Sequence, residues 1–187
     1  MTSIDEFLQD ATQRMAKSVD ATHEHFNTVR TGRASAALLD RIQVDYYGQQ
    51  TPLQQLATIN VPEPRMLTIQ PFDPSSLKGI EKAIMESDLG LQPANDGKII
   101  RLPIPQLTEE RRKELVKVVR HLAEEGRVAV RNVRRDVMHH LKELVDSGQV
   151  GVDEEHRAED RVQKLTDEHT HKIDELLKRK EAEIMEV

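Results

Sequence analysis

The 187-residue chain contains no cysteine, which excludes disulfide bonds and thiol chemistry. No apolar segment approaches the roughly 20 residues that span a bilayer. The segment from Met1 to Phe7 has two acids and no apolar run, so no signal peptide is visible. An excess of positive charge is missing too, because 27 basic and 33 acidic residues give a net charge of −6. We therefore expect a cytoplasmic protein with no membrane contact, and not a uniformly basic nucleic-acid-binding protein.

The sequence also lacks a motif for catalysis or for metal binding. Its eight histidines form no ligand set, since the neighbouring ones sit one or two residues apart and point in different directions on a helix. Gly90 and Gly97 are separated by six residues rather than four, and Ile99 stands where a phosphate-binding loop has serine or threonine. No Ser/His/Asp arrangement can be placed. We expect no enzymatic activity, no metal and no cofactor.

The prolines divide the chain into two kinds of sequence. All eight lie between residues 52 and 105, whereas helical periodicity lies outside that interval. This shift predicts two domains, one inserted into the other. Residues 1–30 and 106–187 form a three-helix bundle in this prediction, and residues 31–105 form a small β/α/β domain.

The bundle helices carry start signals and apolar stripes. Ser3 makes a capping box with Glu6 at the first start, and Thr108 and Asp153 mark the other two. Gly32 is the expected stop of the first helix, and the second runs to about residue 148. In the insert, alternating residues predict strands at 42–46, 56–61, 66–72 and 99–102, with a short helix at 77–86. The fold class is α+β, with a long antiparallel three-helix bundle and an inserted small β/α/β domain.

One face of the second bundle helix is basic. With Arg131 at zero on a wheel of 100° per residue, Arg134 lies about 60° to the side, and apolar residues cluster on the opposite face. At about 1.5 Å per residue the stripe is roughly 40 Å long, which suits a polyanion backbone better than a small ligand. Six further basic residues lie within about 40° of Arg131: Lys113, Lys117, Arg120, Arg127, Arg135 and Lys142.

A charged helix face is usually only solvated, and that alternative stays open. Two observations favour a polyanion partner. Residues 111–135 hold nine Lys or Arg and three Glu, a local charge of +6. Arg127 and Arg135 each stand four residues from Arg131, and such like-charge pairs are destabilising by a few tenths of a kcal/mol. The stripe is nearly uniform in sign and is broken by Glu124 and Met138.

The segment Arg30-Thr31-Gly32-Arg33 lies at the first domain junction. It fits a helix C-terminus with favourable cations and a glycine stop, and it equally fits a second phosphate contact at a hinge. The sequence leaves both interpretations open. The second junction contains Pro103, Ile104 and Pro105.

Seven segments of the chain resemble the bacterial ribosome recycling factor family. They span almost the whole chain, and VRNVRRD is the most specific of them. The segments are RTGRAS at 30–35, DYYG at 45–48, TPLQQLA at 51–57, SDLGL at 87–91, LTEERRK at 107–113, VAVRNVRRD at 128–136 and VQKLTD at 162–167.

The resemblance implies an L-shaped molecule with the inserted domain between the first two helices. It implies a factor that binds between the ribosomal subunits after termination and separates them with elongation factor G and its GTP hydrolysis. The bundle would dock on rRNA of the large subunit. The family's important arginines match Arg131 and Arg134, with Arg135 adjacent, and its junction motif matches Arg30, Gly32 and Arg33.

Sequence and resemblance together predict a monomeric, non-enzymatic translation factor. The alternative is a helical RNA- or protein-binding scaffold without recycling activity. The expected hinge residues are Thr31, Gly32, Arg33, Pro103, Ile104 and Pro105. The expected rRNA-binding residues are Arg30, Gly32, Arg33, Lys113, Lys117, Arg120, Arg127, Arg131, Arg134 and Arg135.

Overall fold

The chain forms two compact units in the computed structural model, which describes residues 3–186. The bundle unit comprises the residues up to Arg30 together with Glu109–Glu186, and the sheet unit comprises Thr31–Thr108. In the structure the second boundary follows residue 108, whereas the positions of the prolines predict a boundary after residue 105. Each unit has its own core.

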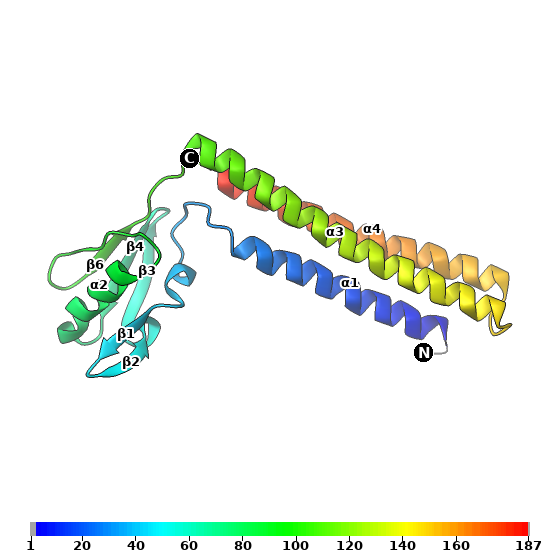
Figure 1. The fold of residues 1–187 in the computed structure, drawn as a ribbon, viewed down its shortest axis with the longest axis horizontal. Helices are drawn as coiled ribbons and strands as arrows, with labels where there is room; N and C mark the ends of the chain where they lie inside the picture. Colours follow the sequence, from blue (N-terminus) through cyan, green and yellow to red (C-terminus); the bar gives the residue numbers. More distant parts are fainter. Residues whose placement is uncertain (1–2, 187) are drawn as a thin grey trace. The chain divides into compact units, whose positions relative to one another are not determined.

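Three long helices build the bundle unit: α1 (Ile4–Asn27), α3 (Glu109–Asp146) and α4 (Val152–Met185). They pack side by side (Figure 1), which confirms the predicted helical part of the fold class. The Ser3 hydroxyl oxygen accepts the Glu6 backbone N–H at 3.2 Å, as the capping box requires. The expected stop of α1 at Gly32 is wrong. The helix ends at Asn27, because the Thr28 hydroxyl and backbone N–H both donate to the His25 carbonyl in its last turn.

Polar side chains take part in the bundle core alongside the predicted apolar stripes. Thr22, Thr166 and His169 are buried. Each side chain bonds to the carbonyl four residues earlier in its own helix, at 2.9 Å for Thr22, 2.9 Å for Thr166 and 2.6 Å for the His169 ring. These bonds give both threonine hydroxyls and one ring nitrogen of His169 a partner within their own helix, so the three residues fit a largely apolar interior.

A four-stranded antiparallel sheet, a separate hairpin and one α-helix build the sheet unit, with three short 3₁₀ helices at Ala36–Leu39, Leu53–Gln55 and Pro74–Ser76. The sheet order is β3 (Ala57–Glu63), β4 (Met66–Pro71), β6 (Ile100–Pro103) and β5 (Ala94–Asn95). The hairpin pairs β1 (Gln43–Tyr46) with β2 (Gln49–Pro52), and α2 (Leu77–Glu86) is the helix. Buried residues of all these layers form one core, which confirms the small β/α/β part of the fold class.

Hydrogen bonds hold both ends of the sheet unit at the turn formed by Pro64 and Arg65, which we call the corner. The Ala34 N–H donates to the Pro64 carbonyl at 2.7 Å, and the Ile104 N–H donates to the Arg65 carbonyl at 2.9 Å. Pro64 and Arg65 are adjacent residues in the β3–β4 turn. The chain therefore enters and leaves the sheet unit at neighbouring carbonyl groups.

Candidate nucleic-acid interface

The basic face of α3 splits into two groups of side chains, and the first group faces α4. The Arg120 Nε lies 2.7 Å from the Glu181 Oε1, and the Arg127 Nε lies 2.7 Å from the Asp174 Oδ1. Arg134 reaches α4 as well, through a bond to Gln163. We call Arg120, Arg127 and Arg134 the seam arginines.

A heptad spacing explains the contacts of the seam arginines. They are seven residues apart on α3, and Asp160, Asp167, Asp174 and Glu181 are seven residues apart on α4. The Arg127–Asp174 pair lies seven residues nearer the C-terminus of α3 than the Arg120–Glu181 pair, and seven residues nearer the N-terminus of α4. This is the register of antiparallel helices whose flanking positions carry opposite charges.

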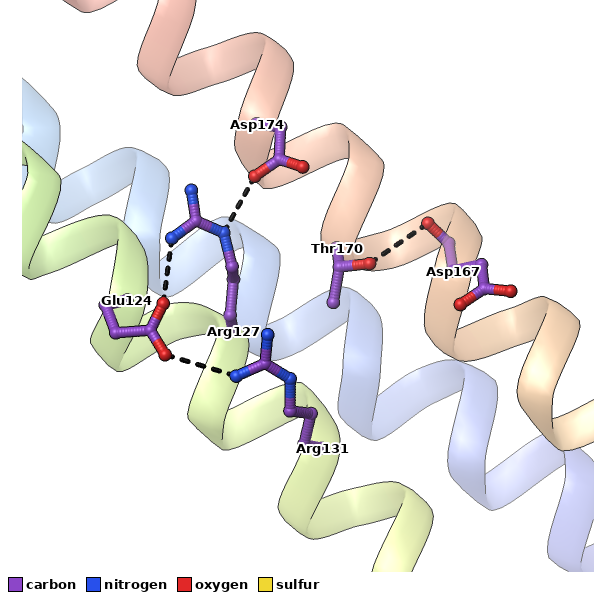
Figure 2. A network of polar contacts seen from close by, with 6 residues as sticks. All are labelled: Glu124, Arg127, Arg131, Asp167, Thr170 and Asp174. Atoms are coloured by element: carbon purple, nitrogen blue, oxygen red, sulfur yellow. Dashed lines mark hydrogen bonds and ion pairs between the residues drawn. The ribbon is translucent and has the colours of Figure 1, made fainter.

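Glu124 links two basic residues of the stripe to each other (Figure 2). Its carboxylate accepts from Arg127 at 2.9 Å and from Arg131 at 3.1 Å. These two hydrogen bonds lower the Glu124 pKa. For Arg127, partial burial opposes the charged form, but the bonds to Asp174 and Glu124 outweigh it and raise the pKa. The repulsion between Arg127 and Arg131 is therefore offset by the Glu124 carboxylate that they share. On the helical wheel, Glu124 is only an interruption of the basic stripe.

The second group of basic side chains points away from the seam. The Arg131 side chain is 50% exposed and pairs with Glu124 of its own helix, whereas Arg120 in the first group is 64% exposed but pairs with Glu181 of α4. Lys117, Arg135 and Lys142 are exposed and make no ion pair with any residue from 3 to 186. Lys113 is also exposed and lies 3.6 Å from Glu109, one turn earlier. We call Lys117, Arg131, Arg135 and Lys142 the outward cations. These four residues make no ion pair with any described residue of α4, so their charges are not neutralised across the seam.

Arg134 is intermediate between the two groups. It is half-buried, and its Nη1 donates to the Gln163 Oε1 at 2.7 Å. The Gln163 Nε2 donates in turn to the Asp167 Oδ1 at 2.9 Å. The Arg134 guanidinium is therefore held in place by a neutral acceptor.

The junction residues fall in different units. Arg30 is the last residue of its part of the bundle unit, whereas Gly32 and Arg33 begin the sheet unit. Both arginine side chains are exposed. Gly32 has a φ of +77°, and a Cβ at that position would lie 3.2 Å from the Leu107 Cγ. The positive φ favours glycine there, and a Cβ would also require the Leu107 side chain to shift slightly. Phosphate binding at Arg30 and Arg33 stays a prediction.

The predicted hinge residues lie mostly outside regular elements. Thr31, Gly32 and Arg33 form an irregular segment, and Ile104 and Pro105 begin another that extends to residue 108. Pro103 is different, because it is the last residue of β6 and pairs with Met66. The Ile104 N–H is bonded to the same turn of the sheet unit. A hinge at the second junction would therefore begin after Ile104.

Other kinds of site find no support in the described part of the chain. Residues 3–186 contain no cluster of three His, Asp or Glu side chains able to hold a metal ion. No described helix is both long enough and apolar enough to cross a membrane.

The α4 partners of the stripe are the functional neighbours that the sequence reasoning missed. Gln163, Asp174 and Glu181 contact the seam arginines directly. The signal that could have found them is the shared interval of seven residues on both helices. A wheel of α3 alone contains no information about its partner.

Comparison with known proteins identifies the chain's relatives. The family model for the ribosome recycling factor matches residues 22–185. The ribosome-recycling factor of Rubrobacter xylanophilus is 59% identical over 180 residues, covering 96% of this chain and 97% of that protein. The Alkaliphilus metalliredigens factor is 55% identical over 175 residues, with 94% and 95% covered.

Solved structures agree with the sequence relatives. A solution structure of the ribosome recycling factor superposes with a TM-score of 0.76 at 42% identity, covering all of both chains. A second structure describes models of the T. thermophilus ribosome recycling factor and the E. coli elongation factor G bound to the E. coli post-termination complex. It gives a TM-score of 0.65 at 47% identity and covers 98% of this chain and 100% of that one. The present chain therefore belongs to the ribosome recycling factor family.

Proposed function

We propose that this protein splits post-termination ribosomes into subunits together with elongation factor G and GTP. The observation that carries the proposal is the match of both units, over nearly the whole chain, to ribosome recycling factors. One such relative is described together with elongation factor G on a post-termination complex. In this proposal the chain is a cytoplasmic, monomeric translation factor and not an enzyme.

The outward cations supply the contact with rRNA of the large subunit in this proposal. They follow one face of α3 and are not neutralised by α4. Phosphate contacts of this kind release counterions, so the logarithm of the binding constant falls by about 0.7–0.9 for each contact per tenfold rise in salt. The acidic remainder of the chain limits loose binding to other RNA, because it repels phosphate outside the oriented contact.

The sheet unit moves relative to the docked bundle in this mechanism. Its irregular connections at residues 31–33 and 105–108 are short, and both start from the corner at Pro64 and Arg65. Elongation factor G would push on the sheet unit, and the GTP that it hydrolyses would provide the free energy. The recycling factor converts that motion into the breakage of contacts between the subunits.

Sedimentation of post-termination ribosomes tests the proposal directly. Ribosomes are incubated with this protein, elongation factor G and GTP, and each component is omitted in turn. We expect free subunits only when all three are present. Intact ribosomes, under conditions in which an established recycling factor splits them, would reject recycling and favour a helical scaffold that binds RNA or protein.

A further inference from the structure

The α3–α4 seam contains one position where the charge pattern is broken. Arg120 and Arg127 each meet a carboxylate of α4. The next step of the same register would pair Arg134 with Asp167. Instead, Gln163 lies between them and accepts the bond from the Arg134 guanidinium.

We propose that Gln163 is a positioning residue, which orients Arg134 without neutralising it and so keeps the Arg134 charge available for an RNA phosphate. The inference rests on the proposed function, since it assumes that the basic face of α3 meets RNA. It adds a residue from α4 to a surface that the sequence assigns to α3 alone.

The comparison with the other basic residues of the face supports this role. Lys117, Arg135 and Lys142 carry a free charge, but no ion pair within the described chain holds them in place. Arg131 is held, but by the Glu124 carboxylate. Within residues 3–186, Arg134 is the seam arginine whose bonded acceptor is uncharged. The bond from Nη1 to Gln163 holds the planar guanidinium in one orientation. Its remaining N–H donors then point in fixed directions, which suits bidentate contact with phosphate.

Asp167 sets the direction of the Gln163 amide. A glutamine amide has an acceptor oxygen on one side and a donor NH₂ on the other, and its neighbours decide which way it points. The Asp167 carboxylate can only accept, so it takes the Nε2 side and leaves the Oε1 toward Arg134. In this arrangement the Gln163 side chain separates the Asp167 carboxylate from the Arg134 guanidinium, and the two charges do not form an ion pair.

The substitution Gln163→Glu tests the inference, because it keeps the shape of the side chain and adds the missing neutralising charge. We expect the affinity for large ribosomal subunits to fall about tenfold and the salt slope to decrease by about one phosphate contact. The new carboxylate gains an ion pair with Arg134 but loses the amide donor to Asp167 and stands beside that like charge, so thermal unfolding followed by circular dichroism is used to check that the variant is folded at the assay temperature.

Two controls separate this effect from general repulsion of RNA by an added acid. In the Arg134→Ala background, Gln163→Glu should cause no further loss of affinity, because its effect passes through Arg134. Glu181→Gln, the converse change at the Arg120 pair, should not weaken subunit binding. An equal loss with and without Arg134, or wild-type affinity and salt slope in Gln163→Glu, would overturn the inference.

The outcomes also separate the inference from the function on which it rests. A wild-type protein that splits ribosomes, with Gln163→Glu unchanged in affinity and slope, would reject the inference alone. A wild-type protein that binds subunits but does not split them would reject recycling, while the comparison of affinities still decides the role of Gln163. A wild-type protein that does not bind ribosomes would overturn both, because Arg134 would then have no phosphate to meet.

Discussion

Replacing Gly126 by alanine should destabilise the bundle, although alanine is the better helix former. Gly126 lies in α3 and is buried. A Cβ there would stand 3.2 Å from both the Thr22 Cβ of α1 and the Ile173 Cδ1 of α4, and much closer still to the Thr22 hydroxyl oxygen. Thr22 has little freedom to turn away, because its hydroxyl donates to the Ser18 carbonyl and its side chain is β-branched. The added methyl group must therefore push the three helices apart.

The expected magnitude is the difference between two terms. Overpacking of a close-packed core costs roughly 1–3 kcal/mol, and the rigid neighbours of Gly126 favour the upper half of that range. Alanine gains about 1 kcal/mol over glycine in helix propensity. We expect the free energy of unfolding of the bundle to fall by about 1–2 kcal/mol.

Gly79 provides the matched control in helix α2. A Cβ there would make ordinary contacts, at 3.6 Å from the Asp45 carbonyl oxygen and 3.7 Å from the Val44 Cγ1. Gly79→Ala should therefore stabilise the sheet unit by about 0.5–1 kcal/mol through helix propensity.

Urea unfolding with two probes measures both substitutions. Circular dichroism at the helix band reports mainly the bundle, which holds the three long helices. Tyrosine fluorescence reports the sheet unit, because the chain has no tryptophan and its two tyrosines are Tyr46 and Tyr47. Thr22→Ala in the Gly126→Ala background should recover stability by removing the clash. A Gly126→Ala bundle as stable as the wild type would refute the packing argument.

Three further predictions use the same assays. Asp96 accepts backbone N–H bonds that lower its pKa from 3.8 to about 2, so its stabilising effect is complete above about pH 4 and is lost as the pH falls toward 2. Asp96→Asn should flatten that part of the fluorescence-monitored pH dependence, and an unchanged acid limb would contradict it. Gly32→Ala should lower the stability of the sheet unit by about 1–2 kcal/mol, because it puts a side chain at positive φ, whereas an unchanged transition would mean that the conformation at Gly32 adds no stability. Arg135→Ala should weaken ribosome binding roughly tenfold with little change in folding, whereas Arg120→Ala should leave binding nearly unchanged and lower the stability of the bundle only slightly, because its ion pair with Glu181 is solvent-exposed. Equal effects of the two arginine variants on binding would remove the distinction between seam and outward residues.

The spacing of apolar residues and the positions of the prolines were enough to predict most of the fold. Apolar residues at helical spacing predict α1, α3 and α4, and the prolines delimit the insert. The short strands β2 and β5 were missed, because they exist through pairing with β1 and β6 rather than through an alternating pattern of their own. The polar core residues were also missed, since their partners are carbonyl groups, which no side-chain pattern reveals.

The candidate site was predicted less completely than the fold. A helical wheel identifies which residues share a face, but it treats that face as one surface. The structure divides it, because α4 approaches from one side and takes Arg120 and Arg127 into ion pairs. These partners lie 61 and 47 residues further along the chain. Only a comparison of the two helices at the same heptad spacing could have found them from the sequence.

The corner at Pro64 and Arg65 has a consequence for the order of folding. In an unfolded chain, bringing α1 and α3 together closes a loop of roughly 80 residues, the length of the sheet unit, and the entropy cost grows with the logarithm of that length. Once the sheet unit has folded, its two ends are fastened to adjacent carbonyl groups. The loop that remains consists of residues 28–33 and 105–108, ten residues in all, so the closure cost falls by about 2 kcal/mol. A sheet unit that folds first therefore removes most of the entropy cost that its own length adds to bringing α1 and α3 together.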